Sequence, residues 1–113
     1  METGHALSST RGRISIAGKA VAQIVGHTVA ECYGVVGMDG GRVGRLRPRE
    51  TRGVEVRGTP GGLEITLHVV VEYGLNLAEV ASTIRSRVAY EVGRLTGLDV
   101  ASVEVHVADV RHS

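Results

Sequence analysis

The chain has 113 residues, the size of one domain, and its 42% hydrophobic content excludes an intrinsically disordered protein. The formal net charge of +1 provides no general attraction to nucleic acid or to membranes. Aromatic residues make up only 3% of the chain, so we expect a core of aliphatic side chains.

The N-terminal third predicts a tail and one helix. We expect a flexible tail at residues 1–12, followed by a β-like entry in the sequence RISIAG at 13–18. Ser15 is a suitable N-cap for the helix that follows. From Ala17 onward the residues that favour burial recur at helical spacing, and Gly34 suits a left-handed stop. The inward positions of this helix are Val21, Val25, Thr28, Val29 and Cys32.

The middle of the chain predicts three strands. The sequence GVVGM at 34–38 is a short strand, and the glycine- and arginine-rich stretch after it is an exposed loop. VEVRG at 54–58 is a second strand, and TPGG at 59–62 is a hairpin turn. The third strand, 63–73, alternates with period two. One face carries Leu63, Ile65, Leu67, Val69 and Val71, and the other carries Glu64, Thr66, His68, Val70 and Glu72.

A second helix and a last strand follow. Asn76 is a suitable N-cap, and Glu79 stands three residues later, as in a capping box. Apolar residues then recur at helical spacing until Gly97, which we expect in a left-handed conformation. The strand 99–110 closes the chain. It places Val103, Val105 and Val107 on one face and Glu104, His106 and Ala108 on the other.

These elements predict a single two-layer α+β domain at residues 13–110. The strands 63–73 and 99–110 flank a helix, so we expect a βαβ unit with parallel strands, and the hairpin adds an antiparallel strand. Each helix has one apolar face. We therefore expect a mixed β-sheet with two helices packed on one face, and an opposite sheet face with no cover within this chain.

Two blocks of the sequence together form a recognisable pattern. The first is RISIAGKAVAQIVGHTVAECYGVVGM. In the second, a GV strand, a strand ending in VEYG, a helix, the sequence TGLDV and a valine-alternating strand follow in order. These two blocks resemble the alkaline shock protein (Asp/Gls) family of bacterial envelope-stress proteins. The resemblance covers about residues 12–110. It implies a non-enzymatic cytoplasmic protein of the envelope and alkaline stress response. Such proteins self-associate in some cases and lie along the membrane through an anchoring partner.

The uncovered sheet face is a candidate surface for a homo-oligomer. Its middle is mixed in character, which favours docking over full solvation. The candidate residues are Thr66, His68, Val70, His106 and Ala108. Imidazoles and carboxylates on this face could also bind zinc or act as acid and base, but their spacing does not predict three or four converging ligands. We expect no metal.

The loop 42–52 is rich in arginine and contains a single acidic residue, Glu50. Its basic residues are Arg42, Arg45, Arg47, Arg49 and Arg52. Three interpretations remain open: a solvated loop, a contact with an acidic protein or membrane surface, and a nucleic-acid clamp. No aromatic residue is interleaved for base stacking, which weakens the last interpretation.

No catalytic residues, cofactor loop or small-molecule substrate are predicted, because the chain shows no nucleophile with a neighbouring base and no phosphate-binding motif. Cys32 is alone and cannot form an intrachain disulfide, which favours a reducing compartment. No apolar run approaches the length of a membrane span. The first hypothesis is therefore a cytoplasmic scaffold or adaptor near the membrane. The alternative is a small nucleic-acid-binding module that uses the loop 42–52.

Overall fold

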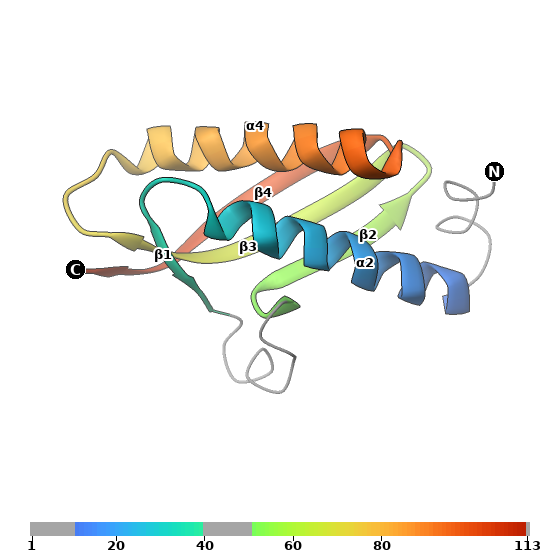
Figure 1. Cartoon of the computed structure of the whole chain (residues 1–113), viewed down its shortest axis with the longest axis horizontal. Coiled ribbons are helices and arrows are strands. Elements are labelled where there is room, and N and C mark those ends of the chain that lie inside the picture. The colour runs from blue at the N-terminus through green and yellow to red at the C-terminus, as the bar shows by residue number, and fades with distance from the viewer. Residues whose placement is uncertain (1–10, 40–50, 113) are drawn as a thin grey trace.

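A computed structural model describes residues 11–39 and 51–112, with side chains of the first helix described from Gly18 onward. The order along the chain is helix, two strands, a third strand, helix and strand (Figure 1). The elements are α2 (Arg11–Ala30), β1 (Val35–Met38), β2 (Val54–Thr59), β3 (Gly62–Glu72), α4 (Leu77–Thr96) and β4 (Val100–Arg111).

The sheet is mixed, with β3 in its centre. Along one edge of β3, the short strands β2 and β1 follow each other, and both are antiparallel to it. Along the other edge, β4 runs parallel to β3 over almost its whole length. The parallel pair β3–α4–β4 and the β2–β3 hairpin are confirmed. A hairpin alone would be marginal in water, so the long parallel strand and the helices provide the remaining stability.

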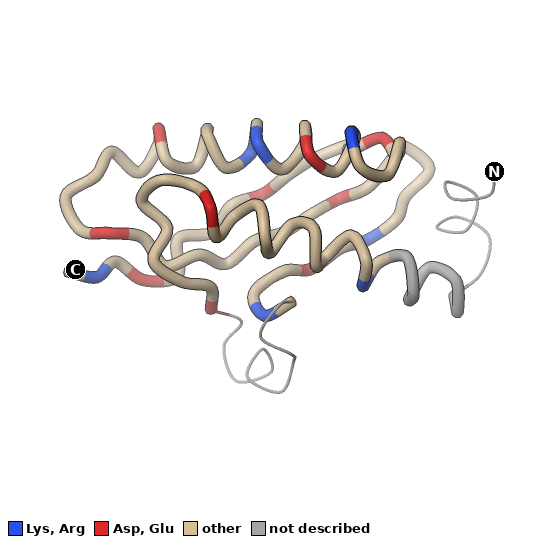
Figure 2. Tube along the Cα trace, viewed as in Figure 1, with Lys and Arg blue, Asp and Glu red and all other residues tan. Residues whose placement is uncertain are grey.

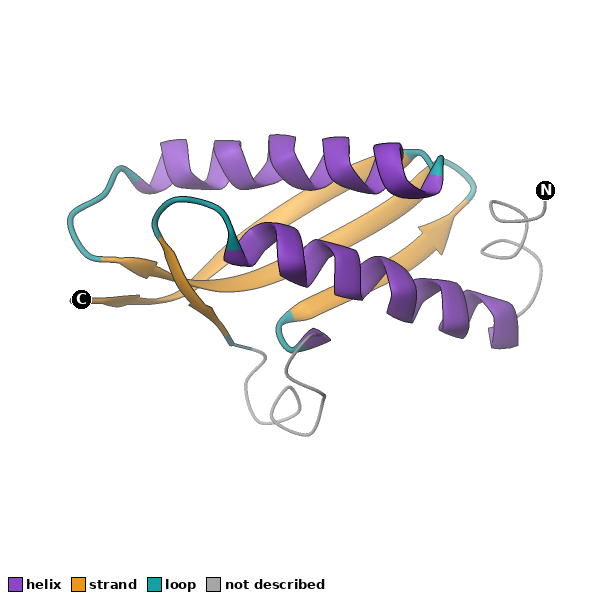
Figure 3. Ribbon diagram, in the orientation of Figure 1, coloured by secondary structure: helices purple, strands orange, loops and turns teal. Residues whose placement is uncertain are grey.

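Both helices cover the same face of this sheet, as Figure 3 shows. The helices pack on one another, with α2 also contacting β2 and α4 contacting β4. The core between the layers is aliphatic, as the composition predicts. The two-layer α+β architecture is therefore confirmed. Fully buried side chains include Val21, Val25, Val29, Leu63, Ile65, Leu67, Val69, Val71, Ile84, Val88 and Val92.

The ends of α4 are defined by the two residues that the sequence singles out. The Asn76 side chain accepts a hydrogen bond from the main-chain N–H of Glu79 at 3.1 Å, which satisfies one of the free donors of the first turn. Gly97 has a φ of 73°, in the left-handed region, and its N–H donates to the Gly93 carbonyl at 2.9 Å. Both expectations are confirmed.

The first helix corrects the sequence prediction at its start. Residues 13–18 are helical rather than extended, and α2 begins at Arg11, so Ser15 lies inside the helix instead of at its N-cap. A strand needs a neighbour for its main-chain groups, whereas a helix satisfies them internally. In the structure the segment 13–18 pairs with none of the strands of the sheet, and its main-chain groups belong to α2.

Candidate interaction face

The face of the sheet opposite the helices, here called the open sheet face, carries polar side chains from three strands. Strand alternation sends the apolar residues of β3 toward the helices and the intervening residues to this face. The register brings residues of β2, β3 and β4 into rows across it. Its members include Glu55, Arg57, Glu64, Thr66, His68, Glu72, Ser102, Glu104 and His106.

Two histidines form one row of this face, and each contacts a carboxylate from the adjacent row, which contains Glu55, Thr66 and Glu104. His68 of β3 is the register partner of His106 of β4. Their rings stack, with centroids 5.2 Å apart and planes inclined by 16°. The Nε2 atom of His68 lies 3.5 Å from a Glu55 carboxylate oxygen, and Nε2 of His106 lies 3.1 Å from Glu104. The prediction that the two histidines share one face therefore describes their placement correctly.

A second polar pair lies on β2 and β3. Arg57 and Glu64 are register partners, and the guanidinium donates two hydrogen bonds to one carboxylate oxygen. The hydrogen bond to Glu64 raises the pKa of Arg57 above its ordinary value, so the arginine stays charged. The two opposite charges of this pair lie next to each other on adjacent strands.

Two members of the predicted oligomer face are placed differently from the expectation. Val70 is only 1% exposed, so its side chain is not available to a second copy. At its register positions lie Gly37 of β1 and Asp109 of β4. A register shift in β4 after Val107 places Asp109, rather than Ala108, opposite Val70. Ala108 is the extra residue of a β-bulge, which a period-two pattern does not predict.

Thr66, His68 and His106 keep their predicted positions on the open sheet face, and Ala108 is at the surface although it is a bulge residue. Thr66 is half-buried on β3, where its register partners are Glu55 and Glu104. His106 and Ala108 are exposed on β4. The exposed part of the predicted set therefore lies on or beside the edge strand β4 rather than at the sheet centre.

The geometry of the histidine row does not suit a metal. Across residues 11–39 and 51–112, no group of three or more histidine, cysteine, aspartate or glutamate side chains is arranged to hold an ion. The ligand types are present, but they form two separate histidine–carboxylate pairs, whereas a metal site needs three or four ligands that converge on one point.

The arginine loop lies mostly outside the described residues, which exclude Arg42, Arg45, Arg47 and Arg49. Arg52 is described and is half-exposed in the turn before β2. It lines a groove between α2 and β1 together with Gln23, His27 and Met38.

On α4, acidic and basic residues are interspersed, so that helix offers no surface of one sign (Figure 2).

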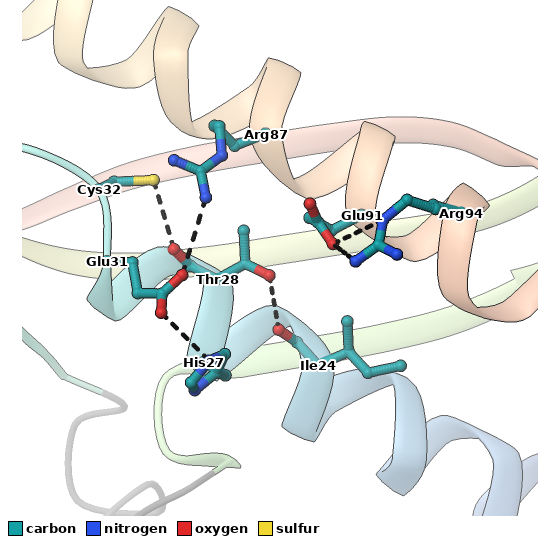
Figure 4. A network of polar contacts seen from close by, with 8 residues as sticks. All are labelled: Ile24, His27, Thr28, Glu31, Cys32, Arg87, Glu91 and Arg94. Atoms are coloured by element: carbon teal, nitrogen blue, oxygen red, sulfur yellow. Dashed lines mark hydrogen bonds and ion pairs between the residues drawn. The ribbon is translucent and has the colours of Figure 1, made fainter.

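A polar network between the helices was not predicted from the sequence. His27 and Glu31, one turn apart on α2, lie 3.2 Å from each other, and Arg87 of α4 reaches Glu31 at 3.8 Å (Figure 4). Further along α4, Arg94 is 2.7 Å from Glu91. The spacing of four residues could have indicated the His27–Glu31 pair. Only the packing of the two helices brings Arg87 to it.

Cys32 lies beside this network but is buried, as the sequence predicts. Its side chain is 4% exposed, and the thiol donates to the Thr28 carbonyl at 3.5 Å. Burial raises the pKa of the thiol, and nearby Glu31 adds to this, although Arg87 acts in the opposite direction. A protonated, buried thiol is a poor nucleophile, so this arrangement does not favour redox chemistry.

Comparison with known sequences settles the family. Residues 6–112 match the alkaline shock protein 23 family, which is described as having a cell envelope-related function. The chain belongs to this family. The resemblance to alkaline shock proteins is confirmed by the match, which spans nearly all of the chain.

Curated relatives of this alkaline shock family chain come from Bacillus and Streptococcus. The uncharacterized protein YloU of Bacillus subtilis is 33% identical over 93% of both chains. The uncharacterized protein Spy1614 of Streptococcus pyogenes is 27% identical over the same shares. A stress response regulator gls24 homolog of S. pyogenes is 30% identical over 92% of this chain, which spans 62% of that longer protein.

The fold is also similar to that of a solved structure. A variant of the MamM CTD matches with a TM-score of 0.50 and 15% identity, over 80% of this chain and 93% of the other. At this identity the likeness concerns the fold alone.

Proposed function

We propose that this alkaline shock family chain is a non-enzymatic, self-associating scaffold or adaptor of the cell-envelope stress response. The family's function is related to the cell envelope, and some relatives are named stress response regulators. The observation that carries the proposal is the uncovered sheet face with its long edge strand. Both helices pack on the opposite face, so the open sheet face and β4 remain accessible to a partner.

The polar groups of the open sheet face support a binding role over a catalytic one. The His106–Glu104 pair is exposed, with half or more of each side chain accessible to solvent. General acid–base catalysis and metal-assisted hydrolysis are both typical of groups in a confined site from which bulk water is excluded. Exposed pairs of imidazoles and carboxylates instead provide complementary groups for another protein surface.

We place the protein in the cytoplasm, next to the membrane, and held there by an anchoring partner. Among the described residues, no helix is both long and apolar enough to cross a membrane. The alternative hypothesis, a small nucleic-acid-binding module, rests on the loop 42–52, of which only residues 51 and 52 belong to the described part of the chain.

Cell fractionation tests this proposal. A tagged full-length chain is expected in the membrane fraction of its own cells, and alkaline carbonate without detergent should release it, because a protein partner rather than a lipid-spanning segment holds it. Affinity capture should identify a membrane protein whose deletion moves the chain to the soluble fraction. A chain that stays in the soluble fraction, with and without envelope stress, would contradict the anchored adaptor.

A further inference from the structure

The outer edge of β4 has no strand beside it within the described part of the chain. The strand is 12 residues long and pairs only with β3 on its inner side. An edge of this length presents unpaired N–H and C=O groups that can hydrogen-bond to another strand. Bulges at Ala101 and Ala108, where the register with β3 shifts, divide the edge and leave 102–107 as its regular segment.

The hydrogen bonds of β3 show which residues of β4 face outward. The N–H groups of His68 and Glu72 donate to the β2–β1 side, at Gly53 and Gly34. Because successive residues of a strand direct their main-chain groups to opposite sides, the odd-numbered residues of β3 direct theirs to β4. Leu63 and Tyr73 do so, since they donate to Asp99 and Arg111.

In a parallel pair of strands, the N–H and C=O of a residue that face the other strand do not bond to the residue's register partner. They bond to the residues immediately before and after that partner. The register pairs are Ile65 with Val103, Leu67 with Val105, and Val69 with Val107. The main-chain groups of Val103, Val105 and Val107 therefore point away from β3 and toward the free edge. Val107 is also 37% exposed, which is high for a valine on the helix-facing side of a sheet.

We propose that β4 pairs in antiparallel orientation with β4 of a second copy, with the two-fold axis at Val105. In this register the outward groups of Val103 meet those of the partner's Val107, and the two Val105 residues exchange hydrogen bonds. On the open sheet face, Glu104 of each chain lies opposite the partner's His106. The pairing rests on the proposed self-association and specifies the surface that carries it.

The charges of β4 distinguish this register from its neighbours. A shift that moves the axis to Glu104 would set two carboxylates against each other, and a shift to His106 would set two imidazoles against each other. An odd shift would face the apolar side of one strand with the polar side of the other. Only the axis at Val105 combines opposite polar partners, paired valines and a regular segment free of bulges.

Two single-residue variants test the pairing by sedimentation of the full chain at low salt. In a dimer of identical chains, Glu104→Lys places the introduced lysine opposite the partner's His106. His106→Glu places the introduced glutamate opposite the partner's Glu104. Each should weaken self-association by about tenfold. An equimolar mixture should recover it, because the introduced lysine of one chain then faces the introduced glutamate of the other. Both positions are exposed, so the fold should persist, and circular dichroism checks it.

The control variant is Glu79→Lys, which makes the same charge change as Glu104→Lys at an exposed position on α4 and should leave association unchanged.

Failure of the mixture to recover association would overturn the proposal. Weakening by His106→Glu but not by Glu104→Lys would move the axis to His106 and overturn the register. Wild-type association that neither variant affects would overturn the edge pairing and leave the scaffold proposal standing. A wild type that is monomeric at every concentration would contradict self-association itself, while fractionation still tests the anchoring.

Discussion

The imidazole rings of His68 and His106 stack across two parallel strands, with their centroids 5.2 Å apart. Each ring also has its own carboxylate, Glu55 for His68 and Glu104 for His106. The stack thus joins the central strand to the edge strand on the open sheet face, where no helix covers the sheet.

A double-mutant cycle measures this stack. His68→Ala, His106→Ala and the double variant should give a coupling free energy of about 0.5 kcal/mol at neutral pH, the low end for ring pairs, because the rings are partly exposed. Urea denaturation of the four proteins provides the values. The same cycle with His27→Ala in place of His106→Ala should give no coupling, since His27 lies on α2 and contacts Glu31. Equal additivity in both cycles would show that the stack contributes nothing.

Two glycines with positive φ should respond differently to alanine. A Cβ at Gly97 would have open space around it, so Gly97→Ala should cost about 1 kcal/mol from left-handed backbone strain alone. A Cβ at Gly62 would lie 2.8 Å from the Asp99 carbonyl oxygen, so Gly62→Ala must also displace main chain at the start of the β3–β4 pair. Chemical denaturation should rank Gly62→Ala as the more destabilising. The reverse order would contradict the close approach at Gly62.

Because Val70 is buried, its substitution tests the stability of the fold instead of self-association. Val70→Ala should lower the free energy of unfolding by about 1–3 kcal/mol, because it removes two buried methyl groups from a position that is 1% exposed. Val36→Ala on β1 is the matched control, since Val36 is 47% exposed, and it should cost much less. Thermal melts of both variants compare the losses. Similar small losses would mean that Val70 is accessible.

Cys32 should make the fold more sensitive to alkali. Its folded pKa is raised above the ordinary value of 9.0, chiefly by burial, so the folded state holds the thiol proton more tightly than the unfolded state. The resulting stability is fully present below about pH 9 and is lost as pH rises toward the folded pKa, with a slope of at most about 1.4 kcal/mol per pH unit. Unfolding free energies of wild type and Cys32→Ala from pH 8 to about pH 11 should therefore converge as the pH rises. Parallel curves would refute the contribution of the thiol.

Much of the fold follows from local patterns along the chain. The alternation in β3, the Asn76 cap, the helical spacing of α4 and the left-handed Gly97 are each encoded within a few consecutive residues. Such features depend on side-chain direction and main-chain conformation, which neighbouring residues largely determine. The shared face of His68 and His106 was predictable as well, because it needs only strand alternation and a parallel pairing without a shift between them.

Tertiary packing decided the features that depend on distant neighbours. Residues 13–18 form the first part of α2 instead of a strand, which the local pattern of RISIAG does not indicate. Because Ala108 is a bulge residue, Asp109 instead of Ala108 lies opposite Val70. Val70 is buried, although the alternation of β3 puts it on the open sheet face. Arg87 reaches Glu31 only because the helices lie side by side. A period-two or helical pattern specifies which way a side chain points, whereas burial and pairing depend on which other segment lies there, and that is decided by the assembled sheet and helices.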